Sequence, residues 1–141
     1  LGYVGEIESV NPELLLVLLK QCFLPVVSPI GLGKDGVTYN INADTTASRI
    51  AVSLNAYKII FMTDVDGVLE DGKLKGQLSS VEAEKLIKKN VISGGMAPKV
   101  SAGVYCVKNG VESAQIINGT VPHSVIAELF TDKGIGTQIV L

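Results

Sequence analysis

Residues 39–68, YNINADTTASRIAVSLNAYKIIFMTDVDGV, decide the fold of this chain. The middle of the stretch predicts a helix, because its apolar side chains recur on one face at helical spacing and Asp44 can cap the first turn. Those apolar residues are Ala47, Ile50, Ala51 and Leu54. Residues 57–63, YKIIFMT, follow directly and are typical of a central, buried β-strand. A helix that leads into a buried strand indicates an α/β protein.

The segments on either side continue the alternation of strands and helices. Further strands are expected at residues 4–10, 24–30, 114–117 and 136–141, and further helices at residues 12–22, 81–90, 98–109 and 122–130. Residues 31–42, GLGKDGVTYNIN, suit a hairpin or a flexible loop. Ser79 and Glu82 match a capping box, and Glu84 precedes Lys88 by about one helical turn. This order predicts one α/β domain with a mostly parallel sheet.

Composition narrows the class of protein. The chain has 141 residues, of which 47% are hydrophobic and 5% aromatic, so its core must be built from Val, Ile, Leu and Ala, as in buried parallel sheets. Twelve basic and fourteen acidic residues give a net charge of −2 without a basic run. This balance argues against nucleic acid and anionic membranes as partners.

Other sequence features exclude further classes. No apolar run reaches the roughly 18 residues that a membrane span requires. Cys22 and Cys106 lack the spacing of a metal or redox motif, so both are expected to be reduced core residues. The chain opens with LGYVGEIESV rather than with Met or a signal-like segment, which leads us to expect further sequence upstream.

Three polar loops fall where strands end or helices begin, and in open α/β sheets ligands bind beyond the carboxyl ends of the strands. The first loop is YNINAD, residues 39–44, in which Asn40, Asn42 and Asp44 alternate with apolar residues. A turn with a helix cap explains Asp44, but it does not explain three short polar groups on one side of the chain.

The second loop is TDVDGV, residues 63–68, whose two carboxylates and glycine could hold a metal, a ribose or a phosphate. A calcium-binding loop is excluded, because Leu69 and Lys75 occupy the positions of the obligatory glycine and the bidentate glutamate. The alternative is a haloacid dehalogenase-type phosphatase, with Asp64 as nucleophile and Asp66 as general acid. That chemistry also needs a later acidic pair for magnesium, which the sequence does not supply.

The third loop is ISGGMAPKV, residues 92–100. Gly94 and Gly95 allow a ligand to approach the backbone closely, and Pro98 suits the first turn of a helix. Lys99 adds a positive charge at that helix start. A solvated lysine beside a flexible loop is the simpler interpretation, and a polyphosphate site is the more specific one. The sequence contains no GxxxxGK[ST] motif, so a P-loop enzyme is excluded.

Three segments together carry a resemblance to a known family. They are YNINADTTASRIAVSLNAYKIIFMTDVDGVL at 39–69, ISGGMAPKV at 92–100 and IINGTVPHSVIAELFTDKGIGTQIV at 116–140. In order and spacing they resemble the C-terminal half of the acetylglutamate kinases, a branch of the amino acid kinase family. The resemblance implies a three-layer α/β/α sandwich whose C-terminal half, residues 1–141 here, binds ATP. It also implies a cytoplasmic homo-oligomer that uses MgATP to phosphorylate the γ-carboxylate of N-acetyl-L-glutamate in arginine biosynthesis.

The resemblance assigns roles to individual residues. Asn40 is similar to the asparagine that contacts acetylglutamate, and Asp44 to the aspartate that positions the catalytic lysines. Lys99 is similar to the lysine that stabilises the transferring phosphoryl group. The residues similar to those that line ATP are Thr63, Asp64, Val65, Asp66, Gly67, Val68, Val91, Ile92 and Ser93.

Two parts of the family pattern fall upstream of this chain: a glycine-rich loop with its own lysine, and the arginine that holds the substrate carboxylate. We therefore expect the chain alone to bind nucleotide without turnover. A kinase for another amino acid, of the aminoadipate or glutamate type, and a non-catalytic nucleotide-binding module remain as alternatives.

The tail of the chain resembles the arginine-inhibited branch of the same family. The residues that this resemblance assigns to an arginine effector site are His123, Asp132, Gly134 and Gly136. Lys133 departs from the pattern, because an acidic residue would suit arginine better. His123 is the single histidine of the chain, which does not support Ser–His catalysis.

Overall fold

The structure is a computed structural model that describes residues 2–131 and 134–141. Its helices are α1 Glu13–Lys20, α2 Ala43–Ser53, α3 Ser80–Lys88, α4 Met96–Lys108 and α5 Ser124–Phe130. Its strands are β1 Ile30–Leu32, β2 Thr38–Asn40, β3 Lys58–Thr63, β4 Leu69–Glu70, β5 Lys73–Leu74, β6 Gln77–Ser79, β7 Ser113–Asn118 and β8 Thr137–Val140. The alternation predicted from residue 43 onward is confirmed, whereas the short strands β4, β5 and β6 were not expected.

Four strands form the main sheet, in the order β3-β7-β8-β6. β3 pairs with β7 and β6 with β8 in parallel, and the β7–β8 pair of this sheet is antiparallel. The α/β class with a mostly parallel sheet is therefore confirmed. The expectation that residues 57–63 form a central strand is wrong for the described chain, because β3 lies at the edge of the sheet. Its side chains alternate between buried Ile59 and Phe61 and outward-facing neighbours such as Met62, which is 50% exposed.

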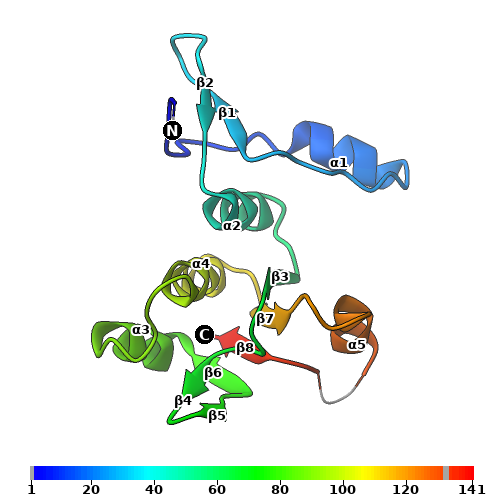
Figure 1. The fold of residues 1–141 in the computed structure, drawn as a ribbon. Helices are drawn as coiled ribbons and strands as arrows, with labels where there is room; N and C mark the ends of the chain where they lie inside the picture. The colour runs from blue at the N-terminus through cyan, green and yellow to red at the C-terminus, as the bar shows by residue number, and fades with distance from the viewer. Residues whose placement is uncertain (1, 132–133) are drawn as a thin grey trace.

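Helices cover both faces of this sheet. α4 packs across β7 and β8, α3 packs beside it against β6, and α2 lies beside α4 and contacts β3 (Figure 1). α5 and the segment 134–136 cover the opposite face, where the Gln115 side chain donates to the carbonyl of Ile135. The layers of the sandwich are thus helix, sheet and helix in this part of the chain, with α2 beside α4 at the β3 edge.

The close approach of α4 to the sheet depends on one glycine. A Cβ at Gly103 would lie 2.9 Å from Ile139 Cδ1 and 3.2 Å from Ala114 Cβ, so a side chain there would require Ile139, Ala114 or the helix to shift. The fully buried residues around this contact form an aliphatic core, as the composition predicted. They include Leu78, Ala83, Val100, Cys106, Ala114, Ile116 and Ile139.

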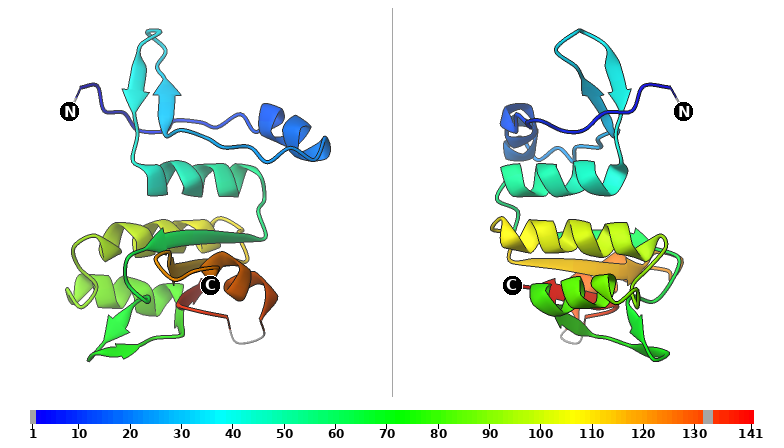
Figure 2. Two further views of the ribbon diagram at one scale, coloured as in Figure 1. Left: turned by 45° about the vertical axis from the view of Figure 1, so that its right-hand side comes forward. Right: turned by 90° about the vertical axis from the view of Figure 1, so that its left-hand side faces the viewer.

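Residues 2–41 project from the α/β layers as an extended arm that carries α1 and the β1–β2 hairpin (Figure 2). Residues 4–10 form no strand beyond a single bridge from Val4 to Asn40, and residues 24–29 are irregular, so both strand predictions are wrong. A strand requires a neighbour that satisfies its backbone groups, and among the described residues these segments have no paired strand beyond the contact of residues 3–5 with Asn40. Their apolar side chains remain exposed, Leu24 by 88% and Val26 by 93%.

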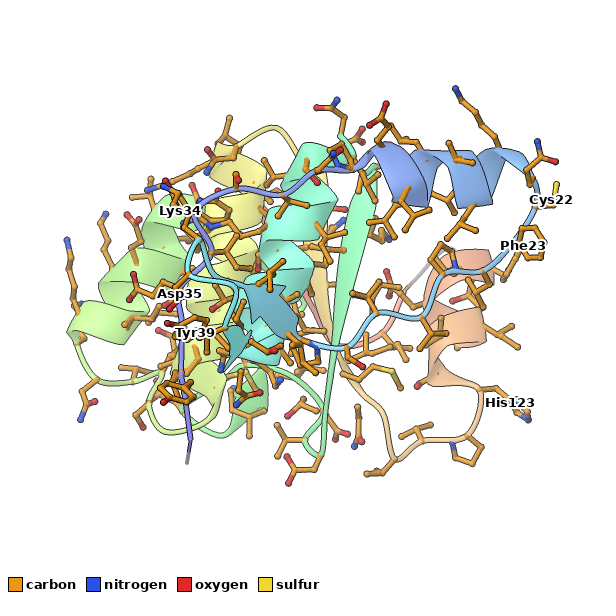
Figure 3. The ribbon with its side chains drawn as sticks, turned by 90° about the horizontal axis from the view of Figure 1, so that it is seen from above. Cys22, Phe23, Lys34, Asp35, Tyr39 and His123 are labelled. Carbon is orange, nitrogen blue, oxygen red and sulfur yellow. The ribbon has the colours of Figure 1, made fainter. Side chains whose placement is uncertain are left out.

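The predicted hairpin at residues 31–42 is confirmed, since β1 and β2 pair antiparallel. Its turn is fixed by Asp35, whose carboxylate accepts hydrogen bonds from the Val37 amide at 3.1 Å and from the Tyr39 hydroxyl at 2.8 Å. These bonds stabilise the charged carboxylate and lower the pKa of Asp35, and they raise the pKa of Tyr39. Lys34, Asp35 and Tyr39 lie together on the hairpin (Figure 3).

Of the two helix caps predicted from the sequence, one is confirmed and the other is wrong. The capping box of α3 is present, because the Ser79 hydroxyl accepts from the Glu82 amide and the Glu82 carboxylate accepts from the Ser79 amide. These bonds hold the pKa of Glu82 below its ordinary value. α2 is capped by Asn42, which accepts from the Thr45 amide at 3.0 Å, and not by Asp44 as expected. Asp44 is thereby free for a tertiary contact.

Three smaller expectations also change. On α2, Ala47 is exposed and Ser48 is buried, so the buried face is rotated from the predicted one. Glu84 pairs with Lys108 of α4 instead of Lys88. Both cysteines are free, but only Cys106 is buried, where loss of hydration raises its thiol pKa, whereas Cys22 is exposed. No helix within the described residues is long and apolar enough to cross a membrane.

One buried ion pair ties α5 to the sheet. Lys58 Nζ, at the start of β3, lies 2.7 Å from Glu128 Oε1 of α5, and the Glu128 side chain is only 3% exposed. Glu128 Oε2 accepts a hydrogen bond from the Ile135 amide at 2.8 Å, so the same carboxylate also holds the segment that leads into β8.

Replacing Lys58 with Met should destabilise the fold by about 2–3 kcal/mol, because it leaves the Glu128 carboxylate buried without its cation. Urea unfolding followed by circular dichroism measures the difference. The matched control is Lys34→Met, which removes an ion pair to Glu8 whose side chains are 85% and 73% exposed, and which should change stability little. Equal losses in the two variants would contradict this account of the buried pair.

Candidate functional site

The carboxyl edge of the sheet gathers most of the sequence-predicted site residues. β3 and β7 are parallel neighbours, so they end side by side at Thr63 and Asn118. α2 and α4 each lead into one of these strands through a short connection and pack back on it, which places their N-termini over the same edge. Polar groups from four elements therefore meet at one edge, where α/β proteins bind ligands.

The centre of the site is an ion pair between two helix starts. Lys99 Nζ, in the first turn of α4, lies 2.9 Å from Asp44 Oδ1 and 3.1 Å from Asp44 Oδ2, in the first turn of α2. Each side chain is 21% exposed, so the pair is neither fully hydrated nor sealed from a ligand. The structure thus brings together the two residues for which the sequence suggested catalytic roles.

The two charges differ in their local fit. A carboxylate in the first turn suits the positive end of the helix macrodipole, so Asp44 stabilises α2. An ammonium in the first turn opposes the macrodipole, so Lys99 is unfavourable to α4 on local grounds. A residue that breaks a local rule in this way is expected at functional positions. Asp44 offsets the conflict and holds the ammonium beside the start of α4.

The start of α4 is open toward solvent. Gly94 has a φ of +57°, in the left-handed region, and Gly95 occupies the N-cap without a side-chain cap. No protein atom lies within 4 Å of a Cβ built at either glycine. The first amides of α4 are therefore accessible to an anion. Of the preceding residues, Ile92 is buried, whereas Val91 and Ser93 are exposed.

The loop after β3 presents polar atoms and anchors itself with apolar ones. Asp64, Val65 and Asp66 are exposed, whereas Gly67 and Val68 are buried. Within the loop, the Thr63 hydroxyl donates to Asp64 Oδ1 at 3.3 Å. The loop is therefore buried at Val68 and exposed to solvent at Asp64.

Asn118, which the sequence interpretation missed, holds the loop from the neighbouring strand. Its Nδ2 donates to Asp66 Oδ1 at 2.8 Å, and its Oδ1 accepts from the amide and the hydroxyl of Thr120. Sequence could have indicated it, because Asn118 ends a buried strand just as Thr63 does. In the haloacid dehalogenase alternative Asp66 is the general acid, and in the structure its Oδ1 accepts this hydrogen bond.

Asn40 ends β2, before the start of α2. Its backbone bonds to Tyr3 and Gly5, and its exposed side chain makes no hydrogen bond to another described residue. No hydrogen bond joins the Asn40 side chain to Lys99 or Asp44 among the described residues, although Asn40 precedes α2 by only three positions.

The residues that the resemblance assigned to an arginine effector site do not all lie in one place. Gly134 and Gly136 line a cavity of about 620 Å³ on the face of the sheet covered by α5. Gly136 also serves packing, since a Cβ there would collide with the Ile116 carbonyl oxygen. His123 is exposed at the start of α5 and points away from the fold (Figure 3). Asp132 lies outside the described residues.

The sequence matches a known family over most of its length. The model of the amino acid kinase family matches residues 2–118. The acetylglutamate kinase of Desulforamulus reducens is 51% identical over 99% of this chain and 50% of its own length. The chain thus spans about half the length of the curated relatives that it matches.

Solved structures agree in fold. N-acetylglutamate synthase from Neisseria gonorrhoeae, complexed with coenzyme A and L-arginine, superposes with a TM-score of 0.92 at 33% identity, over 98% of this chain and 32% of that one. Carbamate kinase from Giardia lamblia bound to AMP-PNP superposes with a TM-score of 0.73 at 20% identity, over 93% and 44% of the two chains, and shows the shared fold alone. From the arrangement of its sheet, its ion-paired helix starts and these matches, the chain belongs to the amino acid kinase family.

Proposed function

We propose that this chain is the nucleotide-binding half of an acetylglutamate kinase, an enzyme that transfers the γ-phosphoryl group of ATP to the γ-carboxylate of N-acetyl-L-glutamate. The observation that carries the proposal is the Lys99–Asp44 pair at the open start of α4, in a chain about half identical to acetylglutamate kinases. Cytoplasmic location and a place in arginine biosynthesis belong to the same proposal.

The chemistry requires little beyond positioning and charge. A phosphoryl group that passes between two oxygens spreads negative charge over its equatorial oxygens. Lys99 and the accessible amides of α4 are suited to stabilise that charge, and Asp44 keeps the Lys99 ammonium in place. A carboxylate acceptor is already ionised at neutral pH, so the reaction needs no general base.

ATP is proposed to lie along the carboxyl edge, over residues 63–68 and 91–93. Magnesium would enter with the nucleotide phosphates, and Asp64 or Asp66 would be the residues of this chain able to help hold it. This fits the donor set, since the described residues contain no group of three His, Cys, Asp or Glu side chains that could hold the ion alone. The ion would supply neutralisation of phosphate charge.

Two alternatives differ in what the chain does with the nucleotide. An aminoadipate-type or glutamate-type kinase shares the same edge and differs in the acceptor site. A non-catalytic nucleotide-binding module shares the loops but lacks transfer. The level of identity to acetylglutamate kinases favours the first proposal over both.

The isolated chain should bind MgADP weakly and show no acetylglutamate kinase activity, because the nucleotide loops are present and the acceptor site is proposed to lie upstream. Isothermal titration calorimetry with MgADP and a coupled kinase assay measure the two properties. A Lys99→Ala chain provides the control for binding at the edge. Robust turnover by the purified chain, or absence of MgADP binding, would contradict the proposal.

In a fusion of this chain to the upstream half of the Desulforamulus reducens relative, Lys99→Ala should lower kcat by about 10²–10³ and change the acetylglutamate KM little, because the charge acts on the transition state. Asn40→Ala should instead raise that KM. Steady-state kinetics with each substrate varied separates the two effects. A change confined to the ATP KM in both variants would show that these roles are misassigned.

Arginine is proposed as an inhibitor of the same fusion, acting at the tail residues His123, Gly134 and Gly136 together with Asp132, and homo-oligomer formation belongs to this proposal. Support comes from the resemblance of the tail and from the Neisseria gonorrhoeae synthase, whose structure was solved in complex with L-arginine. Millimolar arginine should slow the wild-type fusion severalfold at saturating substrates, and His123→Ala should relieve the inhibition. Unchanged wild-type rates would leave the tail as scaffold.

A further inference from the structure

We infer that Thr137, in the strand that closes the chain, is the positioning residue of the nucleotide loop. The inference rests on the proposed function of residues 63–68, and it gives the C-terminal segment a part in nucleotide binding. Thr137 is the first residue of β8 and is completely buried. It lies 69 positions along the chain from Val68, so only the tertiary fold brings the two together.

The hydroxyl of Thr137 is inserted into a backbone ladder. The Lys75 amide donates directly to the Val68 carbonyl at 2.9 Å, which is one of the two bonds expected of an antiparallel pair. The second bond is replaced by a bridge: the Val68 amide donates to Thr137 Oγ1 at 2.8 Å, and Thr137 Oγ1 donates to the Lys75 carbonyl at 2.7 Å. One hydroxyl therefore sets the distance between the two backbone segments that flank the β4–β5 hairpin, at Val68 and Lys75.

The same hydroxyl fixes the residue before Val68. Gly67 has a φ of +143°, and a Cβ built on it would lie 2.6 Å from Thr137 Oγ1 and 2.8 Å from Leu74 Cδ1. The glycine is thus required by its conformation and by the contact with Thr137. Gly67 and Val68 are the buried end of the loop, and Thr137 holds them in place. Thr137 thereby determines the position of the exposed Asp64 and Asp66, which precede them.

A hydroxyl is specifically needed at this point. It must accept from one backbone group and donate to another, which a methyl group of the same size cannot do. Thr137→Val would leave the Val68 amide and the Lys75 carbonyl without their bridge, or let them close on each other and move Gly67. In either case the loop is displaced or loosened while the apolar contacts of the side chain remain.

The test compares MgADP affinity of the 141-residue chain by calorimetry in the wild type, Thr137→Val and Thr137→Ser. Thr137→Val should bind MgADP about tenfold more weakly, the order of effect of one lost hydrogen bond to a buried backbone group, and Thr137→Ser should bind as the wild type does. Thr131→Val is the matched control, since its hydroxyl donates to the Ala127 carbonyl on α5 and does not touch the loop. Wild-type affinity in folded Thr137→Val overturns the inference.

Hydrogen exchange of the Val68 amide supplies a second readout that does not depend on nucleotide. Exchange should accelerate in Thr137→Val and stay slow in Thr137→Ser and Thr131→Val at equal global stability. If the wild type binds no MgADP, the proposed function fails while this exchange pattern still decides the positioning role. If Thr137→Val does not fold, Thr137→Ser decides, because loss of MgADP affinity or of Val68 protection in that variant shows that the hydroxyl is not what holds the loop.

Discussion

The parallel pairing of β3 with β7, covered by α4, is the constraint on which the rest of the structure depends. It aligns the carboxyl ends of two strands, and because α2 and α4 return antiparallel to those strands, it places both helix starts over the same edge. Gly103 makes this arrangement possible by letting α4 lie against Ile139 and Ala114. The site is therefore a consequence of the packing, and a wider helix–sheet spacing would move the start of α4 relative to the carboxyl ends of the strands.

At the site, a charge that is unfavourable to its own helix is stabilised by a residue of another helix. The positive charge of Lys99 is unfavourable at the start of its own helix. Asp44 pairs with Lys99, while Asn42 caps α2. Gly94 and Gly67 have positive φ values that other residues adopt only with strain. Positive φ values also occur away from this edge, at non-glycine residues such as Cys22 and Asn55, so strained backbone is not confined to the edge proposed to bind nucleotide.

The arm formed by residues 2–41 behaves differently from the α/β layers. α1 has no buried residue, and large apolar side chains such as Phe23 and Leu24 are exposed. The β3 edge of the sheet is also unpaired among the described residues. Both features are understandable in a chain that spans about half the length of its relatives, because apolar surface of this extent is usually covered by another part of a protein.

The sequence by itself determined the elements whose signals are local: the α/β alternation, the capping box at Ser79, the hairpin turn and the aliphatic core. It also indicated Lys99 and Asp44 as site residues, through their positions at helix starts and the family resemblance. Only the tertiary structure decided which strand lies at the edge of the sheet, that Asn118 holds Asp66, and that Thr137 bridges Val68 to Lys75. The physical reason is range. Caps and turns depend on residues a few positions apart, whereas these bridges and the β3–β7 and β6–β8 pairings join segments more than 50 positions apart, whose meeting depends on the packing of the whole domain.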